Sequence, residues 1–421
     1  MGQVPDDLFL SEKLLVETRM TGFVAKDVTE RGIRDSLRHL MPVSKRFAYF
    51  DHAAVGPIPE PAAEAMRKWV NQSLLQGDVC WPEWSAAVVG LRSSAANLIG
   101  CRTSEIAMIP NTTFGINLVS HGYRWGTSSS PESVVVLENE FSSNLLPWLA
   151  LQKRGIEVRK VPVSGSGEVS LQAIGEAIDS TTRLVAVSWV GYFSGFRLDL
   201  AKLCELVHQA GSQLFVDAIQ GLGVFPINTS EIPIDYLAAD GHKWMLGPEG
   251  AGILFVRESN LDRLEPMMQG WGSLQMAGQF QTARMELKND ASRYEGGSAN
   301  HVGMIGLGES LRMLLSHGSH LSESPIANLV LGNAACIEHG LQSAGATVFR
   351  ARGSDGSDGG LSGILTFEVP GSDPNEIRRH LLREEIVVSV RHGRLRVATH
   401  AYNNEEDIDR LLSTVRQSIS L

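Results

Sequence analysis

The sequence predicts an α/β fold with a large, mostly parallel sheet, followed by a smaller α+β domain. From about residue 130 onward, short apolar runs alternate with helical segments. This alternation is typical of right-handed βαβ crossovers. Beyond about residue 310 the rhythm changes to a different mixture of helices and strands. We therefore divide the chain into a lead-in segment at 1–45, a large domain at 46–312 and a small C-terminal domain at 313–421.

The lead-in segment has a polar, helical pattern and ends near Pro42. In the large domain, four runs with branched apolar residues predict strands. These runs lie at 134–138, 157–163, 184–190 and 213–218. Helices are predicted between them at 144–154, 171–178 and 200–210. Asp199 is placed to cap the last of these helices, and Gly211 is placed to end it.

The small domain opens with a helical region and ends with another helix that begins near Asn404. Three acidic residues in the first turn of that last helix complement its dipole. Between the two helices, IVVSV at 386–390 and RLRVATH at 394–400 predict a strand pair. The remaining elements are a surface loop at 354–360, a strand at 363–369 and a helix that opens at Pro374.

Composition excludes several classes of partner. The chain has 421 residues, 43% of them hydrophobic, and a formal net charge of −10. This charge argues against nucleic acid or an anionic membrane as the main partner. We expect no membrane span, since no apolar stretch reaches the roughly 18–20 residues required. We also expect no metal site, because the histidines have no ligand spacing. The four cysteines are widely spaced, as in a cytoplasmic protein with reduced thiols.

A carboxylate and a lysine follow two neighbouring apolar runs. Asp217 closes the strand QLFVDA, and Lys243 follows the run from Tyr236 to Ala239 within AADGHKW. Ligands of open parallel sheets bind beyond the carboxyl ends of the strands. A lysine forms a Schiff base with an aldehyde, and a buried carboxylate keeps a pyridine nitrogen protonated. The pair therefore indicates pyridoxal 5′-phosphate as the cofactor. A solvated surface lysine is the alternative.

The triplet Asn111-Thr112-Thr113 stands at the start of a predicted helix, FGINLVSHG. The N-terminus of a helix offers free N–H groups to a phosphate, and two hydroxyls add further donors. Taken alone, the triplet is at least as typical of an N-cap. The order of the triplet, Asp217 and Lys243 within one alternating fold favours a cofactor site.

Seven stretches of the chain resemble one family. They are YFDHAAVGPIPEP (49–61), NTTFGINL (111–118), ENEFSSNLLPW (138–148), LFVDAIQG (214–221), DGHKW (240–244), YEGGSAN (294–300) and RHGRLRVATHAYNNEEDIDRL (391–411). On these motifs the chain resembles the class V aminotransferases, a family of pyridoxal phosphate enzymes. The family includes cysteine desulfurases, selenocysteine lyases, kynureninase and isopenicillin N epimerase. The resemblance implies the fold type I of these transferases.

The resemblance implies roles around the cofactor ring. Lys243 would form the Schiff base and later take or return the Cα proton. Asp217 would hold the pyridinium proton, and Gln220 would hydrogen-bond the ring oxygen. Phe141 falls at the position whose ring stacks on the cofactor, where a flat apolar wall is physically reasonable. For Phe141 a plain core residue is the alternative.

The resemblance also implies a phosphate site and a homodimer. Thr113, the backbone of Thr112, and His242 would bind the phosphate. Ser298 lies where the family places a hydroxyl that reaches the phosphate of the partner subunit.

The strand RLRVATH carries the candidate residues for the substrate. Arg394 and Arg396 share one face of this strand, while Leu395 and Val397 take the other. A guanidinium gives a carboxylate two parallel hydrogen bonds. We therefore expect Arg396 to hold the α-carboxylate of an amino-acid substrate. Arg391 would assist with the substrate or bridge the domains. An exposed basic strand is the alternative for all three arginines.

Three positions depart from the desulfurase pattern. Desulfurases carry a catalytic cysteine between their last two strands, whereas this chain has no cysteine after Cys336. Persulfide chemistry of that kind is therefore disfavoured. Asp240 replaces a serine, and we expect it to point away from the phosphate or to pair with a cation. Tyr192 replaces an asparagine near the substrate.

The sequence thus predicts an enzyme that acts at the Cα of an amino acid, aminotransferase-like or isopenicillin N epimerase-like. A cysteine or selenocysteine lyase without a persulfide-forming cysteine is the alternative, followed by a non-catalytic binding protein. A nucleotide-binding oxidoreductase is disfavoured because neither GxGxxG nor GxxxxGK[ST] is present.

Overall fold

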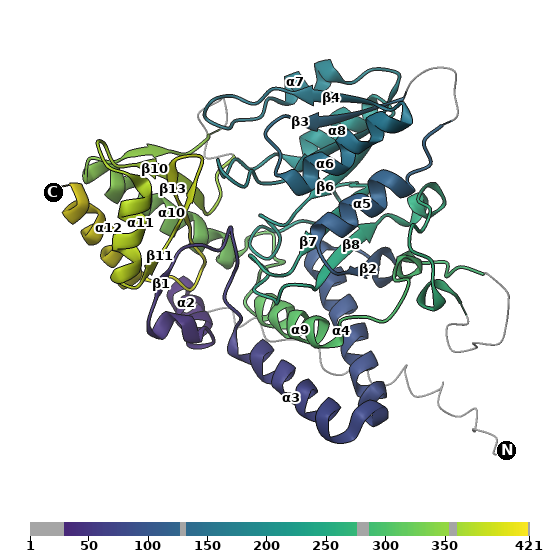
Figure 1. Ribbon diagram of the computed structural model, residues 1–421, viewed down its shortest axis with the longest axis horizontal. Coiled ribbons are helices and arrows are strands. Elements are labelled where there is room, and N and C mark those ends of the chain that lie inside the picture. The colour runs from purple at the N-terminus through teal and green to yellow at the C-terminus, as the bar shows by residue number, and fades with distance from the viewer. Residues whose placement is uncertain (1–28, 127–131, 276–285, 353–359, 420–421) are drawn as a thin grey trace.

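The computed structural model describes residues 29–126, 132–275, 286–352 and 360–419. Within these ranges a central seven-stranded sheet has the order β2-β8-β7-β6-β5-β3-β4 (Figure 1). Neighbouring strands from β4 to β7 run parallel, whereas β8 is antiparallel to both β7 and β2. The predicted α/β fold with a mostly parallel sheet is confirmed. The strands are β2 (Ile106–Ile109), β3 (Ser133–Leu137), β4 (Glu157–Val161), β5 (Thr182–Ser188), β6 (Gln213–Asp217), β7 (Tyr236–Asp240) and β8 (Gly252–Val256).

Both faces of this sheet are buried, which explains why its strands are apolar runs rather than alternating ones. Along β3, Val135 belongs to one hydrophobic cluster, while Val134 and Val136 belong to the cluster on the other face. The helices α4, α7, α8 and α9 contribute to the first cluster, and α5 and α6 contribute to the second. Helix α3 packs on α9. The helices are α3 (Glu60–Gln76), α4 (Trp81–Ile99), α5 (Thr112–Gly122), α6 (Ser142–Ala150), α7 (Leu171–Ala177), α8 (Leu200–Gln209) and α9 (His301–Ser316).

The predicted helix at 144–154 differs from the structure at both ends. Helix α6 already begins at Ser142, and its α-helical part ends at Ala150. A 3-10 turn over Leu151–Arg154 continues the chain to Gly155, whose φ of +80° ends the turn. Tightening of a last turn into 3-10 geometry is common at helix ends. Asp199 caps α8 as predicted, since its side chain accepts a hydrogen bond from the amide of Lys202.

The C-terminal part is an antiparallel sheet of order β12-β13-β10-β9, covered by three helices. Its elements are α10 (Pro325–Ser343), β9 (Thr347–Phe349), β10 (Ile364–Glu368), α11 (Pro374–Arg383), β11 (Ile386–Val387), β12 (Ser389–Arg391), β13 (Arg394–Ala398) and α12 (Glu405–Ile419). The predicted run at 386–390 is split in two. Its first half, β11, pairs in parallel with β1 (Ala48–Tyr49), and only the second half, β12, pairs with β13.

Two elements from the N-terminal side of the chain therefore belong to the C-terminal part of the structure. Helix α2 (Glu30–His39) and β1 pack against α10 and α12, respectively, and Figure 1 shows α2 and β1 beside the C-terminal helices. The proposed division at 46–312 and 313–421 remains a prediction. Most of the predicted lead-in helix and of the loop at 354–360 lies outside the described residues.

Candidate active site

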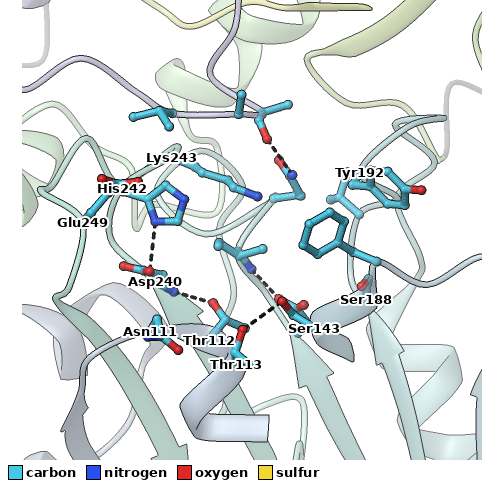
Figure 2. A pocket seen from close by; sticks show the side chains of 18 of the residues that line it. Asn111, Thr112, Thr113, Ser143, Ser188, Tyr192, Asp240, His242, Lys243 and Glu249 are labelled. Atoms are coloured by element: carbon cyan, nitrogen blue, oxygen red, sulfur yellow. Dashed lines mark hydrogen bonds and ion pairs between the residues drawn. The ribbon is translucent and has the colours of Figure 1, made fainter. Parts of the chain in front are cut away.

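The carboxyl edge of the central sheet opens into a cavity of about 350 Å³ (Figure 2). Strands β5, β6 and β7 end there at Ser188, Asp217 and Asp240, which all line the cavity. Nine residues predicted from the sequence lie around it: Thr112, Thr113, Phe141, Asp217, Gln220, His242, Lys243, Arg391 and Arg396. The fold thus brings the candidates for the cofactor and those for the substrate to one place.

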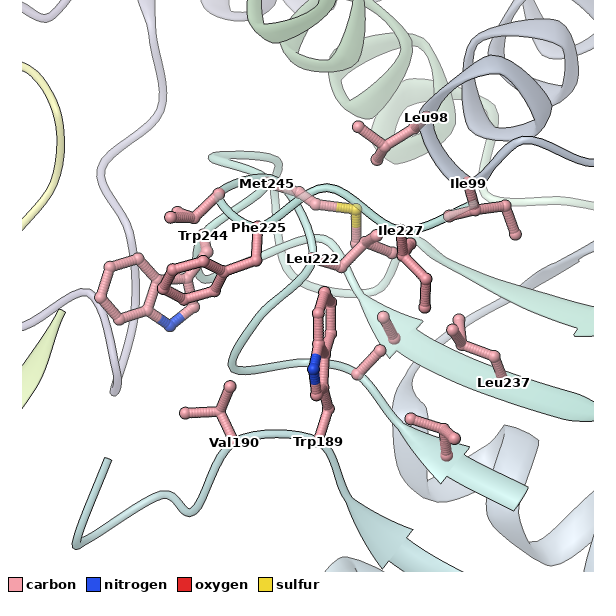
Figure 3. Packing of buried hydrophobic residues seen from close by; sticks show 14 of the residues in the cluster. Leu98, Ile99, Trp189, Val190, Leu222, Phe225, Ile227, Leu237, Trp244 and Met245 are labelled. Carbon is pink, nitrogen blue, oxygen red and sulfur yellow. The ribbon is translucent and has the colours of Figure 1, made fainter. Parts of the chain in front are cut away.

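Lys243 is held by a buried turn that follows β7. Trp244, Met245 and Leu246 are almost completely buried, and Figure 3 shows Trp244 and Met245 within the hydrophobic cluster at this end of the sheet. The chain around Gly56 crosses directly over this turn, and its amide donates a hydrogen bond to the carbonyl of His242 at 2.6 Å. A Cβ on Gly56 would lie 2.2 Å from the carbonyl oxygen of Lys243, so the close approach requires glycine.

The amine of Lys243 faces the cavity, 5.9 Å from the centre of the Phe141 ring. Burial lowers the pKa of this amine to about 8, the charge of Asp217 acts in the opposite direction, and the charges of Arg396 and Arg391 lower it further. A lysine with a lowered pKa has a larger neutral fraction near pH 7, as a nucleophile or general base requires.

Asp217 and Gln220 lie at the end of β6. Burial raises the pKa of the Asp217 carboxyl to about 6. Among the described residues this carboxylate accepts one hydrogen bond, from the amide of Ile219 at 3.1 Å. Gln220 is anchored at both ends of its amide: it donates to the carbonyl of Ala53 at 3.0 Å and accepts from the indole of Trp244 at 2.8 Å. One N–H of Gln220 remains for a ligand.

The N-terminus of α5 forms the other end of the cavity. The side chain of Asn111 caps the helix by accepting from the amide of Phe114, so the N-cap alternative holds for this residue. No carbonyl within the helix can accept from the amides of Thr112 and Thr113, because both lie in the first turn. The hydroxyl of Thr112 accepts from the amide of Asp240, and the hydroxyl of Thr113 donates to Ser143.

Asp240 contacts the side chain of His242, and its pairing with a cation remains a prediction. Its Oδ2 lies 3.0 Å from Nδ1 of His242. This contact has the distance of an ion pair but not the alignment of a hydrogen bond, because Nδ1 makes no hydrogen bond among the described residues. The contact keeps the carboxylate of Asp240 against the imidazole ring (Figure 2).

Phe141 forms part of the cavity wall. Its side chain is 47% exposed, so the alternative of a core residue is wrong. The ring meets that of Tyr192 edge to face at 5.3 Å. The hydroxyl of Tyr192 points away from Lys243 (Figure 2) and lies 2.8 Å from Nε2 of His392. Two aromatic rings thus line the side of the cavity beside Lys243.

Arg396 is buried beside the cavity, and the alternative of an exposed arginine is wrong for it. Its guanidinium donates to the carbonyl of Tyr192 at 2.8 Å, to Ser389 Oγ at 3.2 Å and to Asp51 Oδ1 at 3.2 Å. Arg391 also lines the cavity, whereas Arg394 pairs with Glu368 outside it.

Ser298 does not line the cavity that contains Lys243. It lines a second cavity of about 590 Å³, together with Gly250, Asn300 and the exposed side chains of Met267 and Met268. Within one subunit it therefore does not reach the cavity of Lys243.

Sequence reasoning missed several polar residues of the site. Asp51 and Ser389 contact Arg396, and Ser143 contacts Thr113. Glu140 is buried behind the cavity and accepts from the amide of Ser188 at 2.6 Å; burial raises its pKa to about 7. Asp51, Glu140 and Ser143 lie inside motifs quoted above, but nothing in their local sequence indicates which residues they contact.

The described residues fit pyridoxal phosphate. A largely buried amine, a buried carboxylate with spare acceptor capacity and the free amides of a helix N-terminus surround one cavity. These groups match the aldehyde, the ring nitrogen and the phosphate of that cofactor. Among the described residues, no group of three or more His, Cys, Asp or Glu side chains is arranged to hold a metal ion. No helix in the described ranges is long and apolar enough to cross a membrane.

Comparison with known proteins supports the same assignment. The family model "Aminotransferase class-V" matches residues 48–421. A relative from Methanothermobacter thermautotrophicus named "Probable cysteine desulfurase" is 28% identical over 414 residues, covering 91% of this chain and 97% of the relative.

Two solved structures share the fold. A cysteine desulfurase from Thermococcus onnurineus NA1 superposes with a TM-score of 0.80 at 24% identity, covering 92% of this chain and 98% of that protein. The cystine C–S lyase C-DES, in complex with cysteine persulfide, has a TM-score of 0.81 at 20% identity, covering 89% of this chain and 99% of C-DES. The chain belongs to the class V aminotransferase family and is a pyridoxal phosphate-dependent enzyme.

Proposed function

We propose that this enzyme acts at the Cα of a small amino acid, with Lys243 as covalent anchor of the cofactor and as the base that moves the Cα proton. The observation that carries the proposal is the Lys243 amine, whose pKa is lowered to about 8 by burial and which faces a cavity shared with Asp217 and Arg396. When bound, pyridoxal phosphate supplies an aldehyde for the lysine and a ring that withdraws electrons from Cα.

The other residues would bind and orient the cofactor and the substrate. Asp217 would hold a proton on the ring nitrogen, because it is a buried carboxylate that lines the cavity at the end of β6. Gln220 would donate its remaining N–H to the ring oxygen, and Phe141 would cover one face of the ring. Arg396 would hold the α-carboxylate of the substrate through its planar pair of N–H groups.

At the phosphate end, the amides of Thr112 and Thr113, the hydroxyl of Thr113, and His242 would bind the phosphate. The contact between His242 and Asp240 supports this role, since it holds the imidazole ring at the wall of the cavity. Asp240 faces His242 rather than standing alone near the phosphate.

The reaction we favour remains aminotransferase-like or epimerase-like. One base serves both, because the outcome depends on where the proton is returned. A lyase that cleaves a carbon–sulfur bond is the second candidate, favoured by the relatives named as cysteine desulfurases and by the fold of C-DES. A persulfide on an enzyme cysteine is disfavoured in either case, because the turn from β12 to β13 is His392-Gly393 and no cysteine follows Cys336.

We also propose a homodimer located in the cytoplasm. Ser298 would reach the phosphate of the partner subunit, and the exposed Met267 and Met268 beside it supply apolar surface for such an interface. The location rests on the four cysteines, which are all free thiols in the structure.

The deciding experiment is an absorption spectrum of the purified protein before and after borohydride, followed by peptide mass mapping. We expect a near-ultraviolet to visible band that borohydride abolishes, with the reduced cofactor attached to Lys243. The variant K243A should lose the adduct and turnover, whereas K202A, which changes an exposed lysine paired with Asp199, should keep both. A colourless protein that stays colourless with added pyridoxal phosphate would remove the proposal. Full cellular function of K243A would favour a binding protein.

A further inference from the structure

The hairpin of β12 and β13 contributes Arg391 and Arg396 to the wall of the cavity. Its two-residue turn, His392-Gly393, has positive φ at both positions, 47° and 76°, as type I′ hairpin turns require. Arg391 pairs with Arg394 and Ser389 pairs with Arg396 in this hairpin. Because Arg391 and Ser389 are two positions apart, they share one face of β12. That face is the one on which Ser389 contacts Arg396.

Contacts from the segment that follows β5 hold the hairpin beside the cavity. Nε2 of His392 lies 2.8 Å from the hydroxyl of Tyr192, 200 positions away. The ring of Phe193 meets that of His392 edge to face at 4.8 Å. Tyr192 in turn packs on Phe141 in the cavity wall. Arg391, the residue before the turn, is thereby kept at the mouth of the same cavity.

The three arginines of the hairpin differ in their partners. Arg396 has the carboxylate of Asp51 at 3.2 Å, and Arg394 has that of Glu368 at 2.7 Å. Arg391 lines the cavity but makes no ion pair with a carboxylate among the described residues; its Nη1 donates to the carbonyl of its own neighbour Val390 at 2.9 Å. Of the two arginines that line the cavity, Arg396 has a carboxylate partner, whereas Arg391 has none within the described ranges.

The charge of Arg391 affects three other ionisable groups of the site. It acts on Lys243, on Arg396 and on Tyr192, in each case disfavouring the more positive form. A substrate with one carboxylate would occupy Arg396 and leave the second cation uncompensated. A second anion at the mouth would remove the repulsion between the two guanidiniums and gain charge-assisted hydrogen bonds.

We propose that Arg391 binds a second anionic group on the substrate, so that the preferred substrate is an amino acid whose side chain ends in a carboxylate. This inference rests on the proposed function, because it takes Arg396 as the site of the α-carboxylate. Phe141 and Tyr192 would flank the side chain between the two arginines.

Paired probes of equal size and different charge test the inference. Glutarate and its monoamide, 4-carbamoylbutanoate, would be titrated into the holoenzyme by calorimetry, a binding readout that requires no turnover. L-Glutamate and L-glutamine would be compared in the same way through the absorption of the bound cofactor. The variants are R391Q and, as a matched control on the same hairpin, R394Q.

We expect glutarate to bind at least about tenfold more tightly than its monoamide, since a hydrogen bond to a carboxylate is stronger than one to a neutral amide. R391Q should weaken glutarate binding about 10- to 100-fold and monoamide binding no more than about threefold. R394Q should preserve the preference. Equal affinities in the wild type, or a preference that survives R391Q, would overturn the inference.

The same samples separate this inference from the proposed function. If peptide mapping finds the cofactor on Lys243 and the two probes bind equally, only the inference fails. If no adduct forms on Lys243, the proposed function fails and the inference fails with it.

Discussion

Oδ1 of Asp51 lies 3.2 Å from Nη2 of Arg396, although the two residues are 345 positions apart. The same oxygen accepts a hydrogen bond from Ser389 Oγ at 2.7 Å. Arg396 has 2% of its side chain exposed, so its charge is balanced within the protein by this carboxylate. The pair joins the segment after β1 to β13 and fixes the direction of the guanidinium that we assign to the substrate carboxylate.

The first prediction concerns Asp51. D51A should raise the KM for the amino-acid substrate about tenfold or more and change kcat much less, because Arg396 loses its orientation rather than its charge. D51N retains the shape and an acceptor oxygen and should have a smaller effect. E368Q, which removes the partner of Arg394, is the matched control. A change confined to kcat, or an equal effect of E368Q, would contradict the positioning role.

The second prediction concerns the pKa of Lys243. In the cofactor-free protein, competitive acetylation followed by mass spectrometry should give a midpoint near 8, with the exposed Lys202 as internal reference. The charge of Asp217 raises the pKa of Lys243, so D217N should move the midpoint downward. The charge of Arg396 lowers it, so R396Q should move the midpoint upward. Shifts in the opposite directions would show that other charges control this amine.

The third prediction concerns Gly56. G56A places a Cβ 2.2 Å from the carbonyl of Lys243, so the turn that carries the lysine must move. Because a displacement of about 1 Å can cost about 10²-fold in rate, we expect a loss of that order in kcat/KM. G332A is the control: this glycine is inside α10 with open space around it, and alanine there should stabilise by about 1 kcal/mol or less. Normal activity of G56A would mean that the contact relaxes without moving Lys243.

The fourth prediction concerns pH and stability. Burial lowers the pKa of His400 to about 4, from an ordinary value of 6.5, and His52 is lowered by the same cause. The folded protein therefore binds these protons less readily than the unfolded chain. The contribution of these histidines to the free energy of unfolding should be fully present above about pH 6.5 and should fall as the pH drops toward 4. His400 should account for about 3 kcal/mol or less.

Chemical unfolding midpoints between pH 4 and 7.5 measure this loss. H400Q removes the titrating group and should flatten the pH dependence, whatever it does to the midpoint at pH 7.5. H320Q, at an exposed histidine, should leave the slope unchanged. A slope identical in H400Q and the wild type would mean that other groups cause the loss at low pH.

The fifth prediction concerns the dimer. M268E puts a charge beside Ser298, on a side chain that is 59% exposed, and should shift the protein toward monomers in light scattering. S298A should keep the dimer and weaken cofactor binding. L382E, at an exposed leucine of α11, is the matched control. A wild-type protein that is monomeric at micromolar concentration would reject both the interface and the role of Ser298.

Local sequence was sufficient for much of the fold. The β-branched runs predicted the strands from β3 to β6, because a strand buried on both faces must be apolar throughout. The run at 386–390 shows the limit of such reasoning. Its split into β11 and β12 depends on β1, a partner from the other end of the chain, which no local pattern reveals.

The candidate site also contains some residues that the sequence predicted and others that only the structure revealed. The sequence by itself predicted that Asp217, the N-terminus of α5 and Lys243 lie in one site. Strand ends and helix starts are local features, and parallel strands bring them to one edge of the sheet. Only the tertiary structure decided that Asp51 neutralises Arg396 and that His392 contacts Tyr192. It also decided that Arg391 faces the cavity with no carboxylate partner in the described part of the chain. The reason is physical: burial and the distance between charges set the pKa and the orientation of a side chain. Both are fixed by contacts between segments hundreds of residues apart.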